Sequence, residues 1–66
     1  MSYNTNFDTA NNRMEHDFGN GNLVIVDFNQ NRLFKLHNGD VKEHFSIKGM
    51  LLETYAKILA NIEKSF

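Results

Sequence analysis

The chain has 66 residues, a net charge of -1 and no Cys, Pro or Trp. This length allows one domain with a small core, and the lack of Cys excludes a disulfide scaffold, a cysteine zinc module and a thiol redox site. Seven basic against eight acidic residues argue against a strongly basic nucleic-acid-binding protein. Small domains commonly gain stability from disulfides, metals or partner chains, so a partner or a second copy is the expected supplement here.

The first twelve residues are polar, rich in Asn and Thr, and without a hydrophobic period. We expect residues 1–12 to form a flexible polar arm and residues 13–66 to form a single domain. The arm has no basic region followed by an apolar run, and no apolar stretch approaches the roughly 18 residues that span a bilayer. The expected location is the cytoplasm, without membrane contact.

Four short runs rich in Val, Ile, Leu and Phe follow, separated by turn-forming residues. The turns contain residues 19–21, residues 29–31 and Asn38-Gly39, and the last pair is typical of a two-residue type I′ hairpin. These features predict a four-stranded antiparallel β-meander.

The lengths of the predicted loops assign a face to every strand residue. Three-residue loops at 19–21 and 29–31 and a two-residue loop at 38–39 predict one apolar face that continues across all four strands. The residues predicted for this covered face are Met14, His16, Phe18, Val24, Val26, Phe28, Phe34, Leu36, Val41, Phe45 and Ile47.

Residues 48–66 carry apolar side chains at every third or fourth position, which is the pattern of an amphipathic helix. Glu53 stands four residues before Lys57, a spacing that favours an ion pair on the helix surface. We expect this helix to cover the apolar face of the sheet. The predicted fold is therefore α+β, with four strands followed by one C-terminal helix.

The opposite face of the predicted sheet carries Leu23, Ile25 and Leu33 between an acidic and a basic side. Scattered apolar residues on a solvated face are common, but an apolar group with a polar rim is also typical of a protein–protein interface. We therefore predict an interface, including a dimer interface, formed by Leu23, Ile25, Leu33, Lys35 and Lys42.

Basic residues on one side of the sheet indicate an alternative function. The side chains of Arg32, Lys35, Lys42 and Lys48 could contact the phosphates of a single-stranded nucleic acid. Phosphate binding of this kind would weaken steeply with salt, whereas an apolar interface would not.

Two architectural resemblances accompany these alternatives. A strand meander followed by an apolar helix, with residues 42–57 as the supporting stretch, resembles the PC4-like single-stranded-DNA-binding family, in which two such units dimerise. Residues 23–28 and 55–60 are also similar to the short KTSC domain. No residue role is transferred to this chain from either family.

Patterns typical of catalytic and metal sites are missing from the sequence. His37 and His44 share a predicted face, but about four residue steps, or roughly 13 Å, separate them, which is too far for one metal ion. His16 is expected at the core edge with a hydrogen-bond partner. No Ser lies in a Gly-x-Ser-x-Gly turn, and the Gly-x-Gly at 19–21 precedes no helix. We predict no catalytic residue, cofactor, metal or small-molecule substrate.

The expected function is that of a small non-enzymatic binding or regulatory protein, acting through a protein–protein interface as a homodimer. Size and Asn-rich composition would suit a phage or mobile-element accessory protein, or a small subunit of a larger assembly. A single-stranded nucleic-acid-binding module is the alternative.

Overall fold

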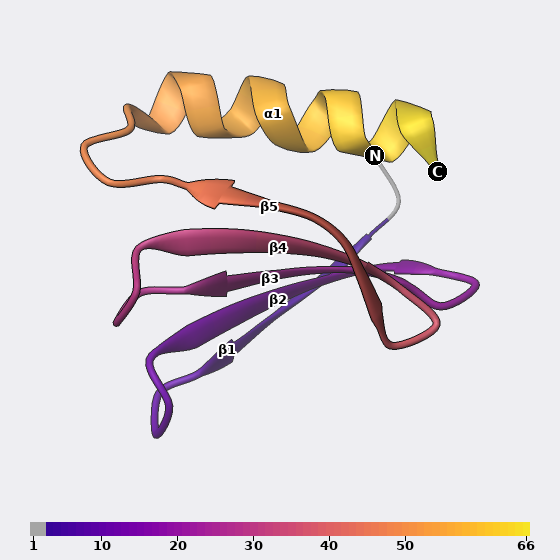
Figure 1. The fold of residues 1–66 in the computed structure, drawn as a ribbon, viewed down its shortest axis with the longest axis horizontal. Helices are drawn as coiled ribbons and strands as arrows, with labels where there is room; N and C mark the ends of the chain where they lie inside the picture. Colours follow the sequence, from indigo (N-terminus) through magenta and orange to yellow (C-terminus); the bar gives the residue numbers. More distant parts are fainter. Residues whose placement is uncertain (1–2) are drawn as a thin grey trace.

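The computed structural model describes residues 3–66, which form one antiparallel sheet and one helix (Figure 1). The elements in chain order are β1 (Asn4–Asp8), β2 (Arg13–Gly19), β3 (Asn22–Asp27), β4 (Arg32–His37), β5 (Asp40–Ser46) and α1 (Leu52–Ser65). The strands follow one another across the sheet in their order along the chain. The predicted α+β fold is confirmed, with five strands in place of four. Within residues 3–66, no helix is long and apolar enough to cross a membrane.

The additional strand, β1, lies inside the segment predicted to be a flexible arm, of which residues 1–2 lie outside the described residues. It pairs with β2 from Asn4 to Asp8, and residues 9–12 form the turn between the two strands. The Asp8 carboxylate accepts hydrogen bonds from the backbone N–H of Asn11 at 3.3 Å and from its side-chain amide at 2.7 Å. All five residues of β1 are exposed, so no hydrophobic alternation marks the strand in the sequence.

A turn of the same construction joins β3 to β4. Asp27 pairs with Arg32, which leaves residues 28–31 in the turn. The Asp27 carboxylate accepts hydrogen bonds from the backbone N–H groups of Asn29 at 2.8 Å and Gln30 at 3.2 Å, and from the Gln30 side-chain amide at 3.2 Å. The residue before the following strand is an Asn with positive φ in both turns, a conformation that Asn adopts at low cost.

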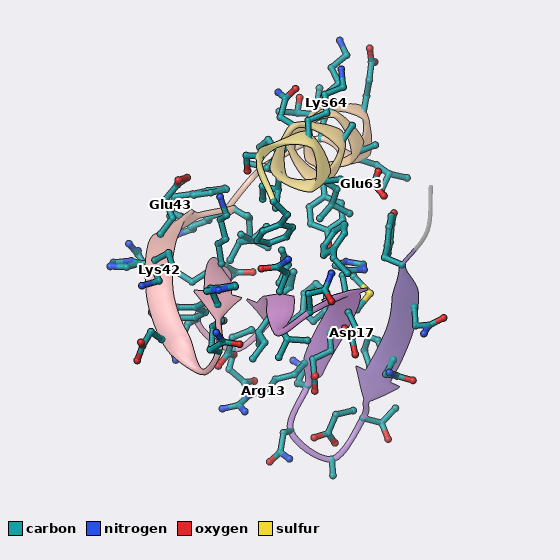
Figure 2. The ribbon with its side chains drawn as sticks, turned by 90° about the vertical axis from the view of Figure 1, so that its right-hand side faces the viewer. Arg13, Asp17, Lys42, Glu43, Glu63 and Lys64 are labelled. Carbon is teal, nitrogen blue, oxygen red and sulfur yellow. The ribbon has the colours of Figure 1, made fainter. Side chains whose placement is uncertain are left out.

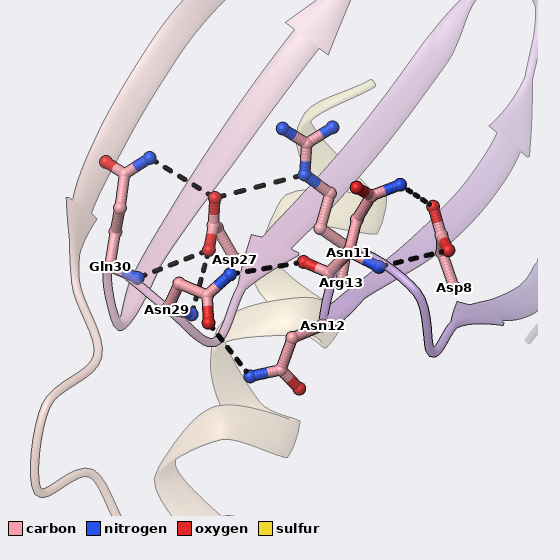
Figure 3. A network of polar contacts seen from close by, with 7 residues as sticks. All are labelled: Asp8, Asn11, Asn12, Arg13, Asp27, Asn29 and Gln30. Atoms are coloured by element: carbon pink, nitrogen blue, oxygen red, sulfur yellow. Dashed lines mark hydrogen bonds and ion pairs between the residues drawn. The ribbon is translucent and has the colours of Figure 1, made fainter.

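The two turns lie beside each other and are bonded together (Figure 3). Asn12 donates its side-chain amide to the side-chain oxygen of Asn29 at 3.3 Å, and Asn29 donates to the Asn11 carbonyl at 3.3 Å. The Arg13 guanidinium approaches the Asp27 carboxylate at 3.9 Å. Asp27 is only 6% exposed, so the donors of Asn29, Gln30 and Arg13 replace the water that its carboxylate has lost.

The length of the β3–β4 turn decides which side chains of β4 face the helix. Because the turn has four residues, Val26 lies opposite Leu33, and Leu33 is 0% exposed beneath α1. Phe34 and Leu36 consequently lie on the opposite face, and their predicted positions on the covered face were wrong. The predicted loop had three residues because Phe28 was assigned to the strand instead of the turn. A shift of one residue in strand pairing moves every side chain of that strand to the opposite face of the sheet.

The β4–β5 hairpin contains the predicted two-residue turn, with φ values of 50° and 86° at Asn38-Gly39. A register shift then follows, so that Val41 pairs with Leu36 while Phe45 pairs with Leu33. A bulge of this kind places two odd-numbered residues of one strand on opposite faces. The covered position predicted for Phe45 is confirmed, and that predicted for Val41 was wrong.

The β2–β3 hairpin agrees with the predicted faces. The predicted three-residue loop at 19–21 was wrong, because Gly19 pairs with Asn22 and the turn is formed by Asn20-Gly21. A register shift between Asp17 and Gly19 supplies the extra residue that keeps the predicted faces. Met14 pairs with Val26 and His16 with Val24, so the even-numbered residues of both strands share the covered face, as predicted.

The core lies between α1 and the covered face, where side chains of both layers fill the space (Figure 2). Its buried apolar members are Val24, Val26, Leu33, Leu59 and Ile62. The helix begins four residues later than the predicted stripe, after a turn in which Gly49 has a φ of 73°. The expected surface ion pair of the helix is present, with Lys57 Nζ 3.3 Å from Glu53 Oε1.

Leu33→Ala and Leu36→Ala distinguish the observed register from the predicted one. We expect Leu33→Ala to lower the free energy of unfolding by about 2–5 kcal/mol, because it leaves a cavity in the core. Leu36→Ala should lower it by only about 1 kcal/mol, because Leu36 lies on the uncovered face. Urea unfolding of both variants measures the difference, and a larger loss for Leu36→Ala would contradict the register.

Asp27→Ala tests the turn that sets this register. We expect a loss of about 1–3 kcal/mol in the free energy of unfolding, because the N–H groups of Asn29 and Gln30 lose their acceptor in a partly buried turn. Asp8→Ala is the matched control and should cost less, since water can replace the exposed Asp8 carboxylate. Equal losses in urea unfolding would show that burial of Asp27 is unimportant.

Candidate interaction surface

The sheet face that α1 leaves uncovered, here called the open face, consists of three rows of side chains. Each row runs across all five strands through directly paired residues. The first row holds Asn4, Asp17, Leu23, Leu36 and Val41; the second holds Asn6, Glu15, Ile25, Phe34 and His44; the third holds Asp8, Arg13, Asp27, Arg32 and Ser46.

The apolar members of these rows come together on three adjacent strands. They form what we call the open-face patch, which consists of Leu23, Ile25, Phe34, Leu36 and Val41. All are at least partly exposed, and Val41 is 51% exposed. A shallow cavity of about 200 Å³ opens in the patch, between Ile25, Phe34, Leu36 and Val41 on one side and Arg13, Asp27 and Gln30 on the other. Contiguous exposed apolar surface with a polar rim is typical of interaction sites.

Charged residues of both signs and one histidine lie around the open-face patch. Glu15 and Asp17 lie on β2, beside the patch, whereas Arg32 and His44 lie on β4 and β5. The Arg32 guanidinium donates to His44 Nδ1, with N–N distances of 2.9 and 3.3 Å. Acids and bases also alternate across the first four strands of the third row, and opposite charges in paired positions stabilise a sheet.

The structure divides the five predicted interface residues. Leu23 and Ile25 lie on the open face as predicted, and Lys42 is exposed on the edge strand β5. The placement of Leu33 was wrong, because it is buried beneath α1. The placement of Lys35 was also wrong, because the β4 register puts it on the covered face, opposite Glu43. Its Nζ donates to Ser65 Oγ at 2.9 Å and lies 5.0 Å from the ring centre of Phe66.

Phe34, Leu36 and Val41 are the patch residues that sequence reasoning missed. A repeated sequence pattern could have found them. An Asp followed after three residues by Asn-Arg occurs at 8–13 and again at 27–32. An Asp that begins a turn accepts backbone N–H groups two and three residues later. Counting the turn from Asp27 would have included Phe28 and given the observed register.

The four basic residues predicted to contact nucleic acid do not form one surface. Arg32 lies on the open face and Lys35 on the covered face. Lys42 lines a cavity of about 300 Å³ with Lys35 beside the last turn of α1, and Lys48 lies in the segment between β5 and α1. Their predicted position on one side of the sheet was wrong, because the observed register of β4 puts Arg32 and Lys35 on opposite faces.

A second group of polar side chains connects the sheet to the helix. His16 Nε2 lies 2.6 Å from the Tyr55 hydroxyl, and His16 Nδ1 lies 3.0 Å from Thr5 Oγ1. The ring of Tyr3 meets His16 edge-on, with centroids 5.4 Å apart. Burial lowers the pKa of His16, and burial together with the nearby Tyr3 raises the pKa of Tyr55 to about 12. The predicted core-edge histidine with a hydrogen-bond partner is confirmed.

The remaining histidines are separated by the sheet. His37 Nδ1 lies 2.6 Å from the side-chain oxygen of Asn22 on the covered side, whereas His44 lies on the open face, so the predicted shared face was wrong. Within residues 3–66, no three His, Cys, Asp or Glu residues are grouped so that they could hold a metal ion.

Comparison with known proteins adds no relatives: no protein-family model, curated protein or solved structure matches this chain. The function of the chain is therefore argued from its own residues.

The His16–Tyr55 contact predicts the pH dependence of stability. Because the folded-state pKa of His16 lies below its ordinary value of 6.5, the unfolded chain takes up a proton first as the pH falls. We expect the free energy of unfolding to decrease below about pH 6.5. It should also decrease above pH 10, where the unfolded chain loses the Tyr55 proton before the folded chain does.

Urea unfolding across the pH range checks both limbs. His16→Gln should flatten the acidic limb and Tyr55→Phe the alkaline limb. His44→Gln, which changes an exposed histidine, is the control and should leave both in place. An acidic limb unchanged in His16→Gln would contradict the assignment.

Proposed function

We propose that this chain is a small non-enzymatic binding protein that acts through a protein–protein interface on its open face. The observation that carries the proposal is the open-face patch, in which five large apolar side chains on β3, β4 and β5 remain without a covering layer. Covering such surface is favourable by about 25 cal/mol per Å² of apolar area removed from water. The cavity within the patch offers a recess for a side chain of the partner.

A second copy of the chain is the partner that we propose for this face. A symmetric dimer uses the same surface twice, so that surface has to be complementary to itself. The open face meets this condition, because Glu15 and Asp17 border the patch on one side and Arg32 and His44 on the other. Two copies related by a two-fold axis can place the acidic side of one against the basic side of the other.

The internal polar residues support a binding role rather than catalysis. His16, the most buried histidine, has both ring nitrogens engaged by Tyr55 and Thr5 within the fold. A general base must reach the proton that it abstracts, and these contacts hold the ring between sheet and helix.

Sedimentation of Ile25→Asp tests the dimer. We expect the natural chain to sediment as a dimer at about 50 µM. Ile25→Asp buries a charge at the centre of the interface and should raise the dissociation constant at least about tenfold, because unpaired interfacial charges are costly. Circular dichroism should keep the spectrum of the folded chain, since Ile25 lies outside the core.

Two further variants make the result interpretable. Thr54→Asp introduces the same side chain on the exposed side of α1 and should leave the dimer intact. Val41→Asp changes the most exposed patch residue and should weaken the dimer even if Ile25→Asp proves unstable. A natural chain that sediments as a monomer would refute the dimer, and equal behaviour of Val41→Asp and Thr54→Asp would refute the open face as its interface.

A further inference from the structure

The two edges of the sheet differ in their protection against an added strand. β5 forms one edge, and it carries Lys42 and a register shift, two features that discourage pairing with another chain. β1 forms the other edge and contains no Lys, Arg or Pro, and its pairing with β2 shows no shift. Among the described residues no further strand pairs with β1. Its outer backbone groups are therefore available for hydrogen bonds with an extended segment.

An apolar groove adjoins this edge on the covered side of the sheet. Phe7 of β1 is 55% exposed and stacks on Phe28, with ring centres 5.9 Å apart. Phe28 in turn lines a cavity of about 400 Å³ at the start of α1. We call this cavity the end groove, and its apolar lining is Met14, Phe28, Ile47, Met50, Leu52 and Tyr55. A strand added to β1 would place every second side chain on the covered side of the sheet, the side on which Phe7 and the end groove lie.

The other face of the same edge is acidic. Asp8, Glu15 and Asp17 lie on the open face of β1 and β2, and Figure 2 shows Asp17 on this side of the sheet. Arg13 is the only Lys or Arg among residues 4–19, and it faces the Asp27 carboxylate at 3.9 Å. The Asn11 side chain donates to the Asp8 carboxylate, and this hydrogen bond lowers the pKa of Asp8 below its ordinary value. The charges next to the β1 edge thus favour a cationic partner.

We propose that the β1 edge binds an extended peptide segment as a sixth, antiparallel strand, with apolar side chains toward Phe7 and basic side chains toward Asp8, Glu15 and Asp17. The main chain of the peptide supplies the hydrogen bonds, and the alternation of its side chains supplies the specificity, as in other cases of strand addition. This interaction leaves the open-face patch itself uncovered, but it shares the bordering acids Glu15 and Asp17 with the proposed dimer. A second copy fits the edge poorly, because pairing β1 with another β1 brings two acidic hairpins together.

Synthetic peptides of about seven residues, slightly longer than β1, provide the probes. We expect a capped peptide of alternating Val and Lys to bind, as measured by titration calorimetry, and the corresponding Val–Glu peptide to bind at least about tenfold more weakly. Raising the NaCl concentration from about 50 to about 500 mM should weaken the Val–Lys peptide severalfold. Failure of the Val–Lys peptide to bind at about 1 mM would overturn the proposal.

Backbone methylation of the peptide separates strand addition from simple charge attraction. In a strand, the N–H groups of alternate residues point to opposite sides, so only one set can face β1. Of two peptides, one N-methylated on its Val residues and the other on its Lys residues, one should bind and the other should not. Equal binding by both would show that no backbone ladder forms.

Variants of the protein locate the site. Phe7→Ala should weaken peptide binding by about tenfold, because it removes the apolar contact at the edge. Phe66→Ala is the matched control, because Phe66 is an exposed phenylalanine at the end of α1, outside the end groove and the open-face patch, and this variant should bind the peptide normally. Equal losses in the two variants would overturn the assignment to β1. A Phe7→Ala variant that binds the peptide normally but loses self-association would also overturn the assignment, because the β1 edge would then be occupied by a second copy.

Discussion

The hydrogen bonds that the Asp27 carboxylate accepts from Asn29 and Gln30 are the constraint on which the other features of this molecule depend. They close a four-residue turn between β3 and β4, and the pairing of Asp27 with Arg32 then determines the whole register of β4. A buried carboxylate is tolerated there because every donor around it is supplied by the turn itself or by Arg13. The position is therefore sensitive to any change that removes an acceptor or a donor.

The register has consequences for both faces of the sheet. It directs Leu33 into the core, where the side chain is completely buried, and it leaves Phe34 and Leu36 on the face without a helix. The β5 bulge then adds Val41 to the same face. A chain with such a small core thus keeps several large apolar residues outside it. This distribution is difficult to explain by the stability of an isolated monomer, and it is the physical basis of the proposed interface.

The asparagine residues serve the same construction. Asn11, Asn12 and Asn29 bond the two four-residue turns to each other, while Asn12 and Asn31 provide the positive φ that each turn requires. The turn that begins at Asp8 brings β1 back onto β2, so the sheet gains an edge strand whose five residues all remain exposed. β1 is held by its turn, its ladder, the Thr5–His16 contact and the stacking of Phe7 on Phe28. An edge held in this way keeps its outer side available.

The sequence by itself determined the class of the fold and most of its elements. Alternating apolar residues indicated β2 to β5, Asn38-Gly39 indicated its hairpin, and the three-and-four spacing indicated the helix, because these signals are local. It also placed Leu23 and Ile25 on the face opposite the core. β1 escaped detection because an exposed edge strand has no apolar alternation, although the Asp8 turn repeats the pattern at Asp27. Only the tertiary structure decided between Leu33 and Phe34 as the core residue of β4, because both are apolar neighbours and a single residue in the turn exchanges their faces. The membership of the interaction surface follows from that choice.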